Sequence, residues 1–123
     1  MQDASEVLRG RRVMVVEDEM LVAMEIESLL EEQGCAVVGP APTADRALAL
    51  IDQELPDAAV LDVNLNGQTA LPVVKALRAQ GVPFVLATGY GHALQPELRE
   101  APRVDKPVDH DKLVRVLASL LDA

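Results

Sequence analysis

The chain has 123 residues, half of them apolar, and Phe84 and Tyr90 are its only aromatic residues, so it fits one domain with an aliphatic core. A formal net charge of −9 argues against binding to nucleic acid or to an anionic membrane, since both depend on a basic surface. Cys35 is the single cysteine, which excludes an internal disulfide. Because we find neither a signal-peptide pattern nor an apolar run long enough to cross a bilayer, we expect a cytoplasmic protein.

Strand-like and helix-like segments alternate along the chain. Continuous apolar residues predict buried strands, and apolar residues at helical spacing predict amphipathic helices. In chain order we expect a frayed lead-in (1–11), a strand (12–16), a helix (19–33), a strand (35–39), a helix (44–54), a strand (58–62), a turn (64–67), a helix (70–80), a strand (82–88), a short or mobile helix (92–99), a strand (103–105) and a final helix (110–121).

Polar residues and prolines mark several of these boundaries. Thr43, Thr69 and Asp109 are expected to cap the helices that follow them, because their side chains can accept hydrogen bonds from the first turn. The string Pro40-Ala41-Pro42 is expected to end the second strand. Pro96 forbids a long uninterrupted helix in the segment after the fourth strand.

This alternation predicts an α/β fold in which residues 12–123 form a single domain. We expect a five-stranded parallel sheet with helices on both faces and the strand order 2-1-3-4-5, as in flavodoxin-like folds. That order places the first strand beside the third. It therefore brings Glu17 and Asp18 next to Asp62.

Four short polar signals each stand where a predicted strand ends. They are Glu17-Asp18, Asp62, Thr88-Gly89 and Lys106-Pro107. Because the carboxyl ends of parallel strands meet at one edge of the sheet, these side chains are expected to share a cleft. Three carboxylates, a hydroxyl and an ammonium group in one cleft suit a divalent cation and a phosphoryl group.

In this order and spacing, the four signals resemble those of a receiver domain from a two-component response regulator, with a CheY-like fold. The resemblance covers residues 13–121. The string from Pro83 to Gly91 also resembles the signature of the "FAT GUY" subgroup of single-domain regulators, which is common in alphaproteobacteria. Leu86 stands where that signature has Phe.

The resemblance implies that Asp62 is the phosphoacceptor and that Mg²⁺ is the cofactor. Asp18 and Asp62 would bind the metal directly, together with the main-chain carbonyl of Asn64. Glu17 would act through a bound water molecule. The metal would offset the repulsion among the acids and the charge on the transferred group.

The resemblance also implies roles for the polar residues of the later strands. The Thr88 hydroxyl would donate to a phosphoryl oxygen, and Lys106 would pair with the phosphoryl group or with Asp62. The main-chain N–H groups of Asn64 and Gly89 would be further donors. The Lys106-Pro107 peptide bond would be cis, as it often is in this family.

Two features depart from the typical receiver pattern. The loop Asn64-Leu65-Asn66-Gly67 is short and lacks proline, and Arg103 occupies the position of the usual aromatic switch residue. Tyr90 is the remaining aromatic candidate for that role. We therefore expect phosphorylation to reorganise Gly89, Tyr90 and Gly91, since the two glycines supply backbone freedom.

The implied function is that of a stand-alone signalling domain rather than an enzyme. A sensor histidine kinase or a histidine phosphotransferase would donate the phosphoryl group. Output would come from protein contacts near the last helix, to which Val114, Ala118 and Leu121 could contribute, or the domain would act as a phosphate sink. His92 and His110 lack the helical-bundle setting of a phosphotransfer histidine.

Three alternatives stay open. The chain could be the receiver fragment of a hybrid histidine kinase. It could be an aspartyl-phosphate hydrolase of the haloacid dehalogenase type, although Asn64 stands where that class needs a second carboxylate. A small flavodoxin-like binder of nucleotide or flavin is disfavoured, because Glu17, Asp18 and Glu19 would repel phosphate.

Overall fold

The computed structural model describes residues 3–89 and 94–122. Within them, five parallel strands form one sheet in the order β2-β1-β3-β6-β7, which is the predicted order because β4 and β5 belong to a separate hairpin. The five strands are β1 (Arg12–Val16), β2 (Ala36–Ala41), β3 (Ala58–Asp62), β6 (Phe84–Thr88) and β7 (Arg103–Asp105).

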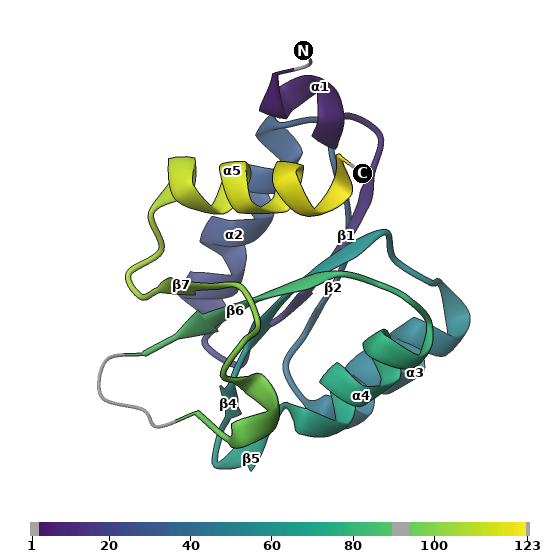
Figure 1. Ribbon diagram of the computed structural model, residues 1–123, viewed down its shortest axis with the longest axis vertical. Helices are drawn as coiled ribbons and strands as arrows, with labels where there is room; N and C mark the ends of the chain where they lie inside the picture. The colour runs from purple at the N-terminus through teal and green to yellow at the C-terminus, as the bar shows by residue number, and fades with distance from the viewer. Residues whose placement is uncertain (1–2, 90–93, 123) are drawn as a thin grey trace.

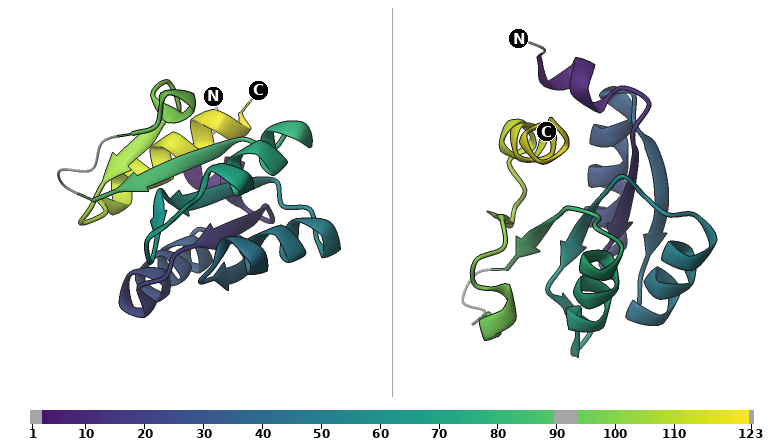
Figure 2. Two further views of the ribbon diagram at one scale, coloured as in Figure 1. Left: turned by 90° about the horizontal axis from the view of Figure 1, so that it is seen from below. Right: turned by 45° about the vertical axis from the view of Figure 1, so that its right-hand side comes forward.

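Helices cover both faces of this sheet, as expected for a parallel sheet (Figure 1). The helices α2 and α5 lie on one face, and α3 and α4 lie on the other (Figure 2). Each face therefore closes over its own aliphatic core, which leaves β3 and β6 buried along their whole lengths. The four helices are α2 (Met20–Glu32), α3 (Ala44–Gln53), α4 (Leu71–Ala79) and α5 (His110–Leu121).

All three predicted capping side chains accept a hydrogen bond from the first turn of their helix. Thr43 and Asp109 accept hydrogen bonds from the N–H groups of Arg46 and Lys112, each at 3.1 Å. Thr69 Oγ1 accepts from the N–H of Leu71, the first residue of α4, at 3.1 Å, although Ala70 lies between Thr69 and the helix. Among the described residues, no helix is both long and apolar enough to span a bilayer.

The expected frayed segment at the start of the chain is instead a short helix, α1 (Ala4–Leu8). Asp3 caps it by accepting from the N–H of Glu6 at 2.9 Å. Val7 and Leu8 are buried in the core between α1, α2 and α5. Burial of this apolar pair against distant helices explains why the segment is ordered.

The second strand also continues further than predicted, through Pro40 to Ala41. Proline is compatible with this position because β2 is an edge strand, where a missing N–H need not break a ladder. Gly39 has a φ of +99°, and a Cβ atom there would lie 2.8 Å from the Ala41 nitrogen, so only glycine fits. The Ala41 carbonyl accepts from the N–H of Glu17 at 3.0 Å, which ties the edge strand to the end of β1.

The predicted turn after the third strand is a small hairpin of β4 (Asn64–Leu65) and β5 (Gln68–Thr69). Asn66 and Gly67 both have positive φ angles, 53° and 87°, which is the two-residue turn that matches strand twist. Of the helix expected over 92–99, residues 94–99 are described, and within them the structure has one 3₁₀ turn, η1 (Pro96–Leu98). This agrees with the limit that proline sets on a helix.

Candidate functional site

Polar side chains from several strand ends line one cleft at the carboxyl edge of the sheet. Val16 of β1 lies opposite Leu61 of β3, so Glu17 and Asp62 follow at neighbouring positions. The parallel register thus produces the convergence that the sequence predicted. The cleft has a volume of about 290 Å³ and is lined by Asp18, Glu19, Asp62, Asn64, Asn66, Gly67, Gly89 and Lys106.

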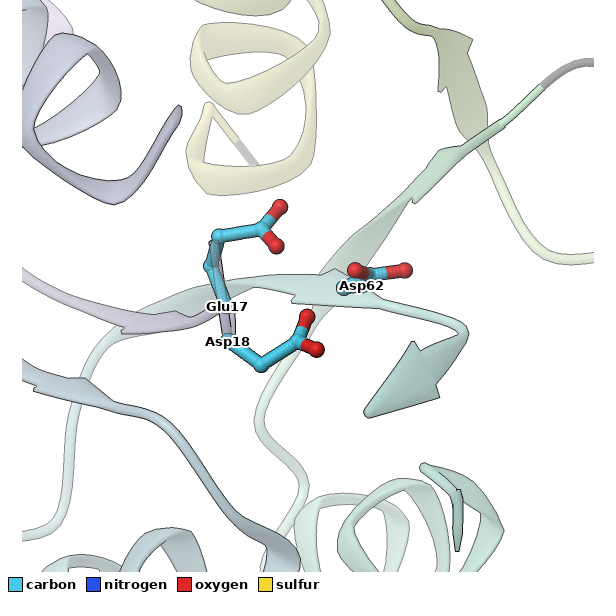
Figure 3. A group of neighbouring side chains, drawn as sticks. All are labelled: Glu17, Asp18 and Asp62. Atoms are coloured by element: carbon cyan, nitrogen blue, oxygen red, sulfur yellow. The ribbon is translucent and has the colours of Figure 1, made fainter. Parts of the chain in front are cut away.

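Glu17, Asp18 and Asp62 form a compact acidic cluster beside this cleft. Figure 3 shows the first two leaving the end of β1 and the third leaving β3, with their carboxyl groups facing a shared space. One carboxylate oxygen of each lies within 4.8 Å of the others. At such separations a pair of like charges repels by about 3 kcal/mol at an effective dielectric constant of about 20. A hard divalent cation such as Mg²⁺, which prefers oxygen ligands, fits this set of donors.

Lys106 supplies the positive charge of the site. Its Nζ lies 2.6 Å from Glu17 Oε1, 3.0 Å from Asp62 Oδ2 and 3.6 Å from Glu19 Oε1. The backbone N–H of Lys106 donates to the Thr88 carbonyl at 2.8 Å, and the Lys106-Pro107 peptide bond is cis. The lysine is therefore held by both its main chain and its acidic partners.

Two of these groups have shifted pKa values, Glu17 because of burial and Lys106 because of its hydrogen bonds. Glu17 is only 3% exposed. Burial raises the pKa of its carboxyl from 4.5 to about 7, although the hydrogen bond with Lys106 opposes this change. For Lys106, burial alone would lower the pKa, but hydrogen bonds to Glu17 and Asp62 outweigh it and raise the pKa above 10.5.

The Asp62 carboxylate is oriented from two sides. Its Oδ1 accepts from the N–H of Asn64 at 3.0 Å, and its Oδ2 accepts from Lys106. The Asn64 side chain accepts from the N–H of Gly67 at 2.9 Å, which fixes the hairpin that carries this donor. Because each carboxylate oxygen has two lone pairs, both still have capacity to bind a cation or to attack phosphorus.

Thr88 lies at the end of β6 and is buried, but its hydroxyl group does not contact the acidic cluster. It donates to Asp105 Oδ1 at 3.4 Å. Asp105 is the residue opposite Thr88 in the β6–β7 pairing. Sequence reasoning missed this partner, because the register of β6 against β7 decides which residue lies opposite Thr88.

Glu19 is a second site residue that sequence reasoning left unassigned. Its N–H donates to Glu17 Oε2 at 3.1 Å, and its carboxylate approaches Lys106. The acidic run Glu17-Asp18-Glu19 was the available signal. Arg103, at the position of the usual switch aromatic, is exposed on β7.

Other residues singled out in the sequence lie elsewhere. His110 Nε2 lies 2.8 Å from Glu25 Oε1, and this exposed pair joins α5 to α2 away from the cleft lining. Val114 and Ala118 are buried between α5 and its neighbours rather than presented to a partner. Tyr90, Gly91 and His92 lie outside the described residues.

Comparison with known proteins places the chain in a family. The model of the response regulator receiver domain matches residues 13–118. The sensory transduction protein LytT of Bacillus cereus is 32% identical over 111 residues, which are 86% of this chain and 45% of that protein. The two-component response regulator PhoP of Pseudomonas aeruginosa is 36% identical over 83 residues, which are 66% of this chain and 36% of that protein. The chain thus spans less than half the length of these two relatives.

Solved structures agree with this match. The solution structure of SdrG from Sphingomonas melonis Fr1 has a TM-score of 0.82 and 38% identity, and the match covers 98% of this chain and 99% of that one. The crystal structure of the response regulator PhyR from Brucella abortus has a TM-score of 0.82 and 33% identity, and the match covers 97% of this chain and 51% of that one. The chain belongs to the response regulator receiver domain family.

Proposed function

We propose that Asp62 accepts a phosphoryl group from a sensor histidine kinase or a histidine phosphotransferase. The observation that carries this proposal is the position of Asp62 in the cleft, 3.0 Å from the Lys106 ammonium and within 4.8 Å of two further acids. An oriented carboxylate with a neighbouring cation is able to attack phosphorus. Membership of the receiver family supports the same role.

The step is a transfer between two nucleophiles. A lone pair of an Asp62 carboxylate oxygen forms the new O–P bond, while the P–N bond of the donor phosphohistidine breaks and its electron pair returns to the imidazole nitrogen. The product is an acyl phosphate on Asp62. Lys106 is placed to neutralise negative charge that moves onto this oxygen and onto the phosphoryl group.

Asp18 and Asp62, with the main-chain carbonyl of Asn64, would hold Mg²⁺, and Glu17 would contribute through water. When bound, Mg²⁺ neutralises the acidic cluster and the charge of the transferred group. Glu17 also pairs with Lys106, which holds the ammonium between the two strand ends. The positive charges of Lys106 and the metal would thus be shared among the three acids.

The acyl phosphate would shift the domain between two conformations. Output would pass to a partner protein through the surface formed by η1, β7 and α5, or the domain would drain phosphoryl groups as a sink. A reducing cytoplasm, where such kinases present their phosphohistidine, suits the free and buried Cys35.

We also propose that Tyr90, with Gly89 and Gly91, carries the conformational change in place of the missing switch aromatic. Amide chemical shifts of residues 89–99, with and without a phosphoryl mimic, test this in Tyr90→Ala. The shifts that accompany the mimic should be reduced in the variant. If they match those of the unmodified protein, Tyr90 has no such role.

The test of phosphoryl transfer uses acetyl phosphate with Mg²⁺ and intact-mass measurement. The natural chain should gain one phosphoryl group, and a chelator should prevent the gain. Asp62→Asn should gain none. Asp57→Asn should react normally, because Asp57 lies just before β3, at the opposite end of that strand from Asp62, where its carboxylate accepts from the Arg12 N–H at 2.8 Å. An equal gain in Asp62→Asn would contradict the proposal.

A further inference from the structure

Thr88 and Asp105 form a side-chain contact that the proposed phosphoryl transfer does not use. The Thr88 hydroxyl is 3.4 Å from Asp105 Oδ1, and the two residues face each other across the last pair of parallel strands. Thr88 is 7% exposed, whereas Asp105 is exposed on the edge strand β7. The buried Thr88 hydroxyl therefore donates to a carboxylate on the neighbouring edge strand.

A hydroxyl group has one proton to donate. In the role that the resemblance to receiver domains implies, the Thr88 hydroxyl donates to a phosphoryl oxygen on Asp62. It cannot do so while its proton points to Asp105. The Asp105 carboxylate and the phosphoryl group are both negatively charged, so charge alone does not favour either acceptor. The presence or absence of the phosphoryl group on Asp62 therefore decides which of them the hydroxyl binds.

We propose that Asp105 is a positioning residue that competes with the phosphoryl group on Asp62 for the Thr88 hydroxyl. This inference rests on the proposed function. In the unphosphorylated protein, Asp105 holds the hydroxyl away from the cleft. In the phosphorylated protein, Thr88 rotates to the phosphoryl group and the Asp105 carboxylate is released at the sheet edge.

The backbone keeps the two residues adjacent in both states. Lys106 directly follows Asp105 in the chain, and its N–H donates to the Thr88 carbonyl at 2.8 Å. A change of partner therefore needs only a side-chain rotation of Thr88. Such a rotation is a small conformational change with a defined barrier between staggered positions.

The surroundings of the Asp105 carboxylate leave it available as an acceptor for the Thr88 hydroxyl. Among the described residues, no lysine, arginine or histidine lies within 4 Å of its carboxylate, which leaves its charge unneutralised. The contact with Thr88 is nevertheless long for an O–H···O bond and partly open to water, so it is weak enough to exchange. A net hydrogen bond of this kind corresponds to roughly a threefold to tenfold change in an equilibrium.

Three-bond NMR couplings across the Thr88 Cα–Cβ bond report its side-chain rotamer directly. They are measured with Mg²⁺ alone and during titration with beryllofluoride, a phosphoryl mimic, in the natural chain and in Asp105→Ala and Asp105→Asn. Asp52→Ala, which removes one exposed charge from α3, is the charge-matched control. Asp105 is exposed, so these variants are expected to fold.

With Mg²⁺ alone, we expect a single Thr88 rotamer in the natural chain and in Asp52→Ala, and averaged couplings in Asp105→Ala. Asp105→Asn should keep the natural rotamer, because its amide oxygen still accepts. The beryllofluoride concentration at half conversion should fall roughly threefold to tenfold in Asp105→Ala.

Two results would overturn the inference in distinguishable ways. Unchanged couplings and an unchanged midpoint in Asp105→Ala, with normal conversion of the natural chain, would refute the competition and leave the proposed function intact. No conversion of the natural chain by beryllofluoride would refute the proposed function, and the competition with it.

Discussion

The buried Glu17 carboxyl makes a specific prediction about stability and pH. In the unfolded chain this group loses its proton near its ordinary pKa of 4.5, but in the folded protein it keeps the proton up to about pH 7. Its contribution to stability is therefore full below pH 4.5 and is lost as the pH rises to about 7. The difference between the two pKa values corresponds to about 3 kcal/mol of unfolding free energy.

Urea unfolding at a series of pH values, in the presence of a chelator, measures this loss. Other groups titrate in the same range, so the informative quantity is the difference between the natural chain and Glu17→Gln, whose amide does not ionise. The unfolding free energy of the natural chain minus that of Glu17→Gln should fall steadily between pH 5 and pH 7. Parallel pH profiles for the two proteins would refute the burial argument. Added Mg²⁺ should reduce the loss, because a cation favours the ionised carboxylate.

Three further predictions concern other residues. Asp18→Asn should abolish the phosphoryl adduct at millimolar Mg²⁺, measured by intact mass, because one direct ligand is lost; normal labelling would exclude that role. Lys106→Met should destabilise the metal-free protein by about 3 kcal/mol in urea unfolding, because it leaves buried acids without their cation; unchanged stability would contradict the pairing. Leu8→Ala should cost about 2–4 kcal/mol in the same assay, because Leu8 is 0% exposed; a cost near zero would mean that α1 does not contribute to the core.

Local signals explain most of the agreement between sequence and structure. The third strand and the last helix were predicted with the bounds that the structure has, 58–62 and 110–121. A run of apolar residues indicates the strand, and the capping residue Asp109 indicates the start of the helix. The alternation of elements and right-handed crossovers leave few topologies, and the strand order expected among them is confirmed.

The differences arise where distant contacts decide the structure. Residues 4–8 are helical because Val7 and Leu8 pack against α2 and α5, which no local pattern reveals. The second strand passes through Pro40 because it lies at the edge of the sheet. In both cases, tertiary position overrides the local propensity.

The same distinction holds within the candidate site. The convergence of Asp18, Asp62 and Lys106 followed from strand order, since each stands at or directly after a strand end. The partner of Thr88 did not follow from strand order, because the exact register of β6 against β7 places Asp105 opposite Thr88. The ion pair between Lys106 and Glu17 did not follow from strand order either, because the conformations of two long side chains decide it.

The site of phosphorylation is the central claim, and chemical trapping tests it most directly. After reaction with acetyl phosphate and Mg²⁺, borohydride reduces an acyl phosphate of aspartate to homoserine, which peptide mass spectrometry then locates. We expect homoserine at position 62 and unmodified aspartate at position 18. Reduction at another acid, or a stable phosphoryl group on His92 or His110 instead, would contradict it.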